Sequence, residues 1–267
     1  PNNEKGTVSF RFQLDGTAED AADASLRVEV TQADAAEVVA SAEERIAGAA
    51  PGLTGEVVCQ LEDPVLWTPD RPHLYSAHAR LEVNGRSCDE VTFRFGMREI
   101  AVADGHFQLN GKPLRLRGSN LLHEWLWGDK YNDNVVSYLV DEARAMSLNC
   151  FRTHTDPPST LWADTADEHG IVFLAEMPLL YNHGDFGYTP EELEVLHRNT
   201  LLDTRNWITK LWNHPSILIW VLSNESRNDN AWEAGPLFDM VKALDPTRLC
   251  MRTGEELTGT PDMVDVH

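Results

Sequence analysis

Apolar and polar residues alternate in short runs along the first 98 residues. Turn dipeptides separate these runs, and Asn84-Gly85 is a strong hairpin signal. Short alternating strands with turns between them predict an immunoglobulin-like β-sandwich over residues 1–98. Its predicted strands are 7–14, 25–32, 37–47, 55–61, 74–83 and 89–95. The segment 37–47 could equally form a short helix, because Ala and Glu favour one.

After Gly96 the pattern changes to strands that alternate with helices, which is typical of a parallel sheet covered by helices. A complete eight-stranded barrel of this type takes about 250 residues, and only about 170 follow Gly96. We therefore expect residues 99–267 to form the N-terminal part of a TIM (β/α)8 barrel, truncated before strand 7. The predicted strands are 114–120, 149–155, 171–178, 217–222, 249–253 and 263–267, and the predicted helices are 134–148, 159–169, 189–212 and 230–244.

The most informative stretch is the fourth predicted strand of this second region. Residues 217–222 are apolar without interruption, which indicates a strand that is covered on both faces. The polar residues Ser223, Asn224 and Glu225 follow at once. Because barrels of this kind carry their chemistry at the C-terminal ends of the strands, Glu225 is a candidate acid or base. The alternative is a structural Glu that caps a helix or pairs with Arg227.

Composition narrows the classes of partner. A net charge of -21 argues against nucleic acid, whose phosphates would be repelled, and indicates a solvated acidic surface. We expect no membrane partner, since no apolar run reaches the roughly 18 residues that a span requires. The spacing of the four cysteines does not suggest a metal site. Cys59 and Cys88 could meet across the sandwich, but buried free thiols are the preferred interpretation. The sequence does not indicate the cellular compartment.

Several segments together resemble glycoside hydrolase family 2, the group of β-galactosidases, β-glucuronidases and related enzymes. The resemblance covers roughly residues 60–267. It rests on the combination of several motifs rather than on any single one. The jelly-roll domain that this family carries in front of the sandwich is not in this sequence. The segments are LWTPDRPHLY (66–75), RFGMREI (94–100), FQLNGKPLRLRGSN (107–120), LWADTADEHGIVFLAEMP (161–178), NHPSILIWVLSNES (213–226) and VKALDPTRL (241–249).

The resemblance implies retaining hydrolysis of β-linked sugars, and we expect a substrate of the β-galactoside type. Glu225 matches the general acid/base of the family, and Asn224 matches the residue that binds the sugar 2-hydroxyl. A retaining enzyme needs a second carboxylate as nucleophile, which the family supplies from the seventh barrel strand. That strand is not in this sequence, so we expect this polypeptide alone to be inactive.

Other predicted strand ends supply candidates for sugar binding. Arg152 matches a family arginine that orients the nucleophile, and Asn120, at the end of the first strand, matches a family asparagine. His154, His123 and His183 lie near family histidines with shifted spacing. Each histidine alone is better interpreted as structural, whereas the set converging on one end of the barrel favours a sugar pocket. Glu176 matches a common family acid and could equally brace Arg152. Trp125 and Trp127 are candidates either for stacking on a sugar or for packing.

Two other functions stay open from the sequence. The first is a non-catalytic carbohydrate-binding or interaction fragment. The second and weaker one is a metal hydrolase that uses His123, His154 and His183, which no ligand spacing supports. The sequence requires no cofactor, although some β-galactosidases of the family bind a divalent ion such as Mg²⁺ near this Glu. The expected partners are a carbohydrate substrate and either a second copy of the chain or further strands that close the sheet.

Overall fold

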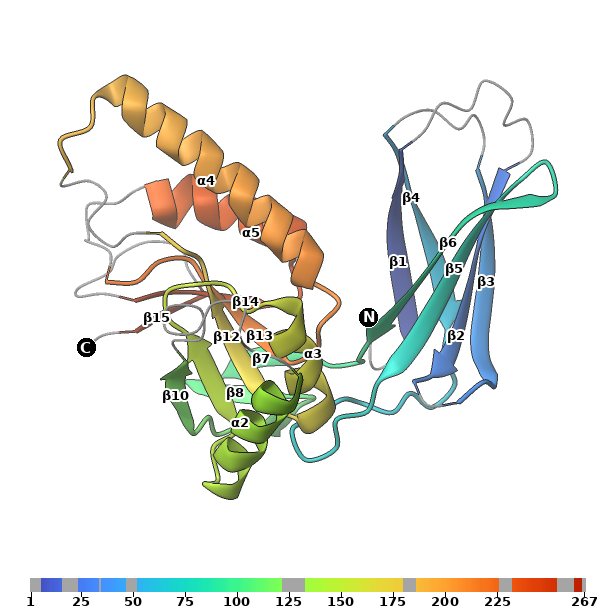
Figure 1. Ribbon diagram of the computed structural model, residues 1–267, viewed down its shortest axis with the longest axis horizontal. Helices are drawn as coiled ribbons and strands as arrows, with labels where there is room; N and C mark the ends of the chain where they lie inside the picture. The colour runs from blue at the N-terminus through green and yellow to red at the C-terminus, as the bar shows by residue number, and fades with distance from the viewer. Residues whose placement is uncertain are drawn as a thin grey trace. The chain divides into compact units, whose positions relative to one another are not determined.

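The computed structural model describes residues 6–15, 24–33, 35–46, 52–121, 133–179, 186–225, 232–253 and 262–265. The chain divides into two compact units (Figure 1). Unit 1 comprises Pro1–Thr68 and His73–Glu99, and unit 2 comprises Pro69–Pro72 and Ile100–His267.

Unit 1 consists of antiparallel sheets whose inward side chains form a common core. β1 (Thr7–Leu14) pairs with β4 (Leu53–Gln60), and a second sheet has the order β3-β2-β5-β6. Asn84 and Gly85 both have positive φ, 50° and 72°, as a tight turn between β5 and β6 requires. The helical alternative for 37–47 is wrong, because this segment pairs with β2 as a strand. The remaining strands are β2 (Ala24–Gln32), β3 (Val38–Ile46), β5 (Tyr75–Val83) and β6 (Arg86–Phe95).

Unit 2 is built on a parallel sheet of order β10-β11-β12-β13-β14-β15. A small antiparallel sheet of β7 (Ile100–Ala103), β8 (His106–Leu109) and β9 (Lys112–Pro113) precedes it. The first parallel strand begins later than predicted, because pairing with β11 starts only at Gly118. The parallel strands are β10 (Gly118–Leu121), β11 (Cys150–Thr153), β12 (Val172–Glu176), β13 (Ile217–Val221), β14 (Leu249–Thr253) and β15 (Met263–Asp265).

Helices connect these parallel strands and cover the sheet (Figure 1). Thr189 and Glu192 form a capping box at the start of α4, each side chain accepting the other's backbone N–H. Gly170 ends α3 at φ 71°, and a Cβ there would lie only 2.1 Å from the Pro69 carbonyl oxygen. The helices are α2 (Asp133–Ala145), α3 (Thr160–His169), α4 (Pro190–Leu211), the π-helix η3 (Glu233–Leu237) and α5 (Phe238–Leu244).

Two details differ from the sequence prediction. α2 ends three residues earlier than the predicted helix 134–148, and Met146, just beyond its end, is 66% exposed. All four cysteines are free, and Cys59, Cys150 and Cys250 are buried, but Cys88 lies exposed on β6. A helix long and apolar enough to cross a bilayer does not occur within the described residues.

Candidate active site

Polar side chains from β11, β12, β13 and β14 meet where these strands end. β13 is completely buried from Ile217 to Val221, as its continuous apolar pattern predicts. Asn224 follows it and is 5% exposed, whereas Glu225 is exposed. Glu225 has φ 48°, a left-handed conformation that is unfavourable for a residue with a side chain. The strand therefore delivers a buried amide and an exposed carboxyl at its C-terminal end.

Arg152 connects three of these strand ends. Its Nε donates to Glu176 Oε2 at 2.6 Å, and its Nη2 donates to Asn224 Oδ1 at 2.6 Å. The same Nη2 lies 3.4 Å from the hydroxyl of Thr253. Because a guanidinium only donates hydrogen bonds, the atom of Asn224 that faces it must be the carbonyl oxygen. This contact leaves the amide nitrogen of Asn224 as its donor for other partners.

Glu176 is the completely buried carboxyl of the group. Burial raises the pKa of Glu176 to about 7, against the opposing hydrogen bond and charge of Arg152, and the Glu225 carboxylate adds to the rise. The backbone N–H of Glu176 also donates to the hydroxyl of Thr153 at 3.1 Å. Glu176 therefore holds the guanidinium of Arg152 through this hydrogen bond. This is the bracing role that the sequence offered as one of two interpretations of Glu176.

His154 lies beside this pair. Its Nδ1 is 3.7 Å from Glu176 Oε1, which is longer than a hydrogen bond. Burial, together with the charge of Arg152, lowers the pKa of His154, and the nearby Glu225 partly opposes the change. The imidazole is therefore favoured in its neutral form, in which one ring nitrogen can accept a hydrogen bond.

Two family models together match nearly the whole chain. The model of "Glycosyl hydrolases family 2, TIM barrel domain" matches residues 100–266, and that of "Glycosyl hydrolases family 2" matches residues 1–98. The chain belongs to glycosyl hydrolases family 2. The predicted fold, an immunoglobulin-like sandwich followed by a partial TIM barrel, is confirmed.

Relatives in the family carry two kinds of name. A β-galactosidase of Thermoanaerobacterium thermosulfurigenes is 33% identical over 195 residues, which are 70% of this chain and 25% of that protein. A β-glucuronidase of Paenibacillus borealis is 29% identical over 222 residues, which are 75% of this chain and 35% of that protein. A solved family 2 structure from Bacteroides cellulosilyticus superposes with a TM-score of 0.82 at 24% identity, covering 94% of this chain and 33% of that one. The chain thus spans about a quarter to a third of these relatives' length.

The remaining candidates from the sequence stand apart from the network. Asn120 lies on β10 opposite Arg152 of β11, but its side chain is exposed. His123 and His183 lie outside the described residues, as do Trp125 and Trp127.

Trp220 lies on β13 close to Glu225 in sequence, but its side chain contacts Asp245 and Trp207 rather than the described site residues. Its indole N–H donates to Asp245 Oδ2 at 3.0 Å, and its ring packs against Trp207 of α4. The ring therefore faces the helices that cover the sheet. A strand with apolar residues on both faces gives no indication of which face a given residue occupies.

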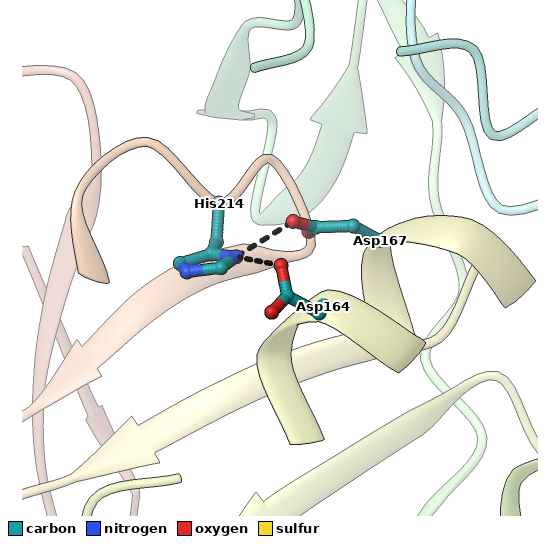
Figure 2. Close-up of side chains that lie close together, drawn as sticks. All are labelled: Asp164, Asp167 and His214. Atoms are coloured by element: carbon teal, nitrogen blue, oxygen red, sulfur yellow. Dashed lines mark hydrogen bonds and ion pairs between the residues drawn. The ribbon is translucent and has the colours of Figure 1, made fainter. Parts of the chain in front are cut away.

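Among the described residues, a group of possible metal ligands occurs at the other end of β13 (Figure 2). His214 Nδ1 lies 2.7 Å from Asp167 Oδ2 and 4.0 Å from Asp164 Oδ1. Asp167 Oδ1 accepts the backbone N–H of Ser216 at 2.9 Å, immediately before β13 begins. Hydrogen bonds within the chain thus already engage both oxygens of Asp167, and we interpret the group as a structural support of β13.

Thr253 is the site residue that the sequence interpretation missed. It ends β14, is completely buried and lies within hydrogen-bonding distance of the Glu225 backbone and of Arg152. The signal that could have found it is its position, because polar residues at the ends of parallel strands are candidates for the site.

Proposed function

We propose that this chain is the sandwich and first part of the barrel of a retaining β-glycosidase, with Glu225 as general acid/base. The observation that carries the proposal is the network in which Arg152 joins Glu176 and Asn224 directly beside Glu225. Such a network fixes the amide next to a carboxyl that stays accessible to substrate. Family membership supplies the reaction class, because the matched relatives are named as glycosidases.

In the proposed mechanism Glu225 first donates its proton to the glycosidic oxygen as the bond to the sugar breaks. A second carboxylate attacks the anomeric carbon and forms a covalent glycosyl-enzyme. Glu225, now a carboxylate, then removes a proton from the water that hydrolyses this intermediate. The nucleophile is proposed to come from a barrel strand outside the present sequence. Glu176 is a poor candidate for it, because it is completely buried and already bonded to Arg152.

Asn224 is the proposed ligand of the sugar hydroxyl next to the anomeric carbon. Because its carbonyl oxygen accepts from Arg152, its amide nitrogen is the group that can donate to that hydroxyl. Arg152 is proposed to act through this orientation rather than by binding the sugar. His154 and Asn120 remain proposed sugar contacts at the same strand ends.

Within this class we propose a neutral β-galactoside as the substrate rather than a β-glucuronide. A glucuronide carries a carboxylate that requires a cationic or polar partner. Among the described strand ends of the site, the guanidinium of Arg152 is already shared between Glu176 and Asn224. This leaves it poorly placed to bind a substrate carboxylate.

The test is hydrolysis of 4-nitrophenyl β-galactoside, β-glucuronide and β-glucoside by the natural protein. We expect the galactoside to be cleaved fastest and Glu225→Gln to lose about 10²- to 10⁴-fold in rate on phenyl β-galactoside, whose leaving group needs the acid. Glu194→Gln, an exposed Glu on α4, is the matched control and keeps full activity. Preference for the glucuronide overturns the choice of sugar, and carbohydrate binding without cleavage of any glycoside favours the non-catalytic alternative.

A further inference from the structure

The hydroxyl of Thr253 lies at the junction between the ends of β13 and β14. It accepts the backbone N–H of Glu225 at 3.0 Å and donates to the Ser223 carbonyl at 3.3 Å. The backbone N–H of Thr253 points to the same carbonyl, also at 3.3 Å. One side chain thus spans the residues on both sides of Asn224.

The Thr253 side chain has a fixed direction. The preceding residue, Arg252, is completely buried and lies 3.4 Å from Glu233 of η3. Successive side chains of a strand point to opposite faces, so this ion pair on one face directs Thr253 to the other. Thr253 is also β-branched, which restricts its χ1 rotation. The hydroxyl is therefore held in one place by packing on both sides of β14.

The bond that Thr253 makes to Glu225 falls on a strained residue. Glu225 has φ 48°, a conformation that residues with a side chain rarely adopt and that persists only where the surroundings impose it. Its backbone N–H is the group that the hydroxyl of Thr253 holds. Since φ sets the direction of the Cα–Cβ bond relative to the strand, this hydrogen bond helps to set where the carboxyl points.

We propose that Thr253 is a positioning residue for Glu225, holding the left-handed backbone that aims the carboxyl at the glycosidic oxygen. The inference rests on the proposed function of Glu225. Thr253 is completely buried and so acts through Glu225 rather than on the sugar. Loss of its hydroxyl therefore displaces the proton donor without removing it.

A displaced acid has a specific kinetic consequence. A glycoside with a poor leaving group, such as phenol, needs a proton as its bond breaks. The leaving group of a dinitrophenyl glycoside departs as a stable anion, so breaking this bond needs little help from an acid. Misplacement of the acid therefore slows hydrolysis of the phenyl glycoside more than that of the dinitrophenyl glycoside. A general loss of structure slows both reactions alike.

The experiment compares Thr253→Val, which replaces the hydroxyl by a methyl group of similar size, with Thr253→Ser, which keeps a hydroxyl. Both are made in the natural protein, and kcat/KM is measured on phenyl and 2,4-dinitrophenyl β-galactosides together with the unfolding temperature. We expect Thr253→Val to lose about 10- to 100-fold on the phenyl substrate and much less on the dinitrophenyl one. Thr253→Ser is expected to stay near the unsubstituted protein on both. Should Thr253→Val fail to fold, Thr253→Ala carries the same comparison.

Equal losses on the two substrates, or a Thr253→Ser variant as slow as Thr253→Val, would overturn the positioning role. Glu225→Gln, run in parallel, separates this failure from that of the proposed function. If Glu225→Gln shows the selective loss and Thr253→Val does not, only the role of Thr253 is wrong. If Glu225→Gln shows no selective loss, the acid assignment itself is wrong.

Discussion

The two ends of β13 both carry polar networks, but they differ in what is left accessible. At the N-terminal end, Arg248 donates to the carbonyls of Ile217, Trp212 and His214 and pairs with Asp245. At the C-terminal end, Arg152 is bonded just as closely, yet it lies beside the exposed and strained Glu225. The bonds that Arg248 makes in the first network join buried or partly buried groups, whereas the second network lies beside a carboxyl that is exposed to solvent.

This difference teaches how one strand serves two purposes. The N-terminal network fixes where β13 begins. Because β13 is buried along its whole length, this also fixes where the strand ends. The C-terminal network then orients the residues that follow. In barrels of this kind the C-terminal face carries chemistry and the N-terminal face carries stability. Substitutions at the two ends should therefore separate activity from stability.

Among the residues that surround Glu225, the largest effect on activity is expected from Arg152→Met. The substitution frees the amide of Asn224 and removes the charge partner of Glu176, so both residues lose their fixed orientation. We expect kcat/KM on a β-galactoside to fall about 10²-fold. Arg152→Lys keeps the charge but cannot form the same fork, so it should recover only part of the loss. Full activity in Arg152→Met would contradict the network's role.

The largest effect on stability is expected at the other end, from Arg248→Met. This change leaves the buried Asp245 carboxylate without its ion pair and three carbonyls without their donor. Breaking a buried pair in this way typically costs about 3 kcal/mol or more of unfolding free energy. Urea denaturation measures the loss, with the exposed Arg205→Met on α4 as a control expected to stay within about 0.5 kcal/mol. The ratio of rates on phenyl and dinitrophenyl galactosides should not change.

A smaller effect is expected for the group in Figure 2. Asp167→Asn weakens the hydrogen bond to His214 and should cost about 1 kcal/mol. Asp164→Asn, at 4.0 Å from the same ring nitrogen and 45% exposed, should be nearly neutral. Denaturation of both variants with and without added divalent cation tests the structural interpretation. A marked stabilisation by the cation, lost equally in both variants, would indicate a metal site instead.

A pH dependence of stability is expected from Glu176. Its pKa rises from the ordinary value of 4.5 to about 7 on folding, mainly through burial. The folded state therefore binds more protons than the unfolded state between these values, so this group's stabilising contribution declines as pH rises from 4.5 through about 7. Glu176→Gln should flatten the stability profile over this range, whereas Glu194→Gln should leave it unchanged. An identical slope in Glu176→Gln would contradict the raised pKa.

Periodicity predicted most of the fold, since β14 spans the same residues, 249–253, that its pattern indicated. Periodicity failed where the extent of a strand depends on the strand with which it pairs. The alternating segment from Leu114 to Arg117 is not part of β10, because pairing with β11 starts only at Gly118. The face of the sheet that Trp220 occupies could not be predicted either. A strand buried on both faces has no polar residues that distinguish one face from the other.

The candidate site divides in the same way. Asn224 and Glu225 were predicted because they directly follow an apolar strand, and Arg152 because it lies near the end of a strand and matches a family residue. Thr253 also ends a predicted strand but was overlooked, and its hydroxyl accepts the backbone N–H of Glu225, which lies just after the neighbouring strand. No pattern along a single sequence encodes a hydrogen bond between the ends of two strands, so this contact required the structure.

The most direct test of the account is chemical rescue of Glu225→Ala in the natural protein. With a dinitrophenyl β-galactoside the covalent intermediate still forms, but no base remains to activate water, so turnover should stall. Azide needs no base to attack that intermediate. We predict that added azide accelerates Glu225→Ala and yields the β-galactosyl azide, while the unsubstituted protein is unaffected. Unchanged turnover with azide, and no galactosyl azide, would contradict the assignment of Glu225 as acid/base.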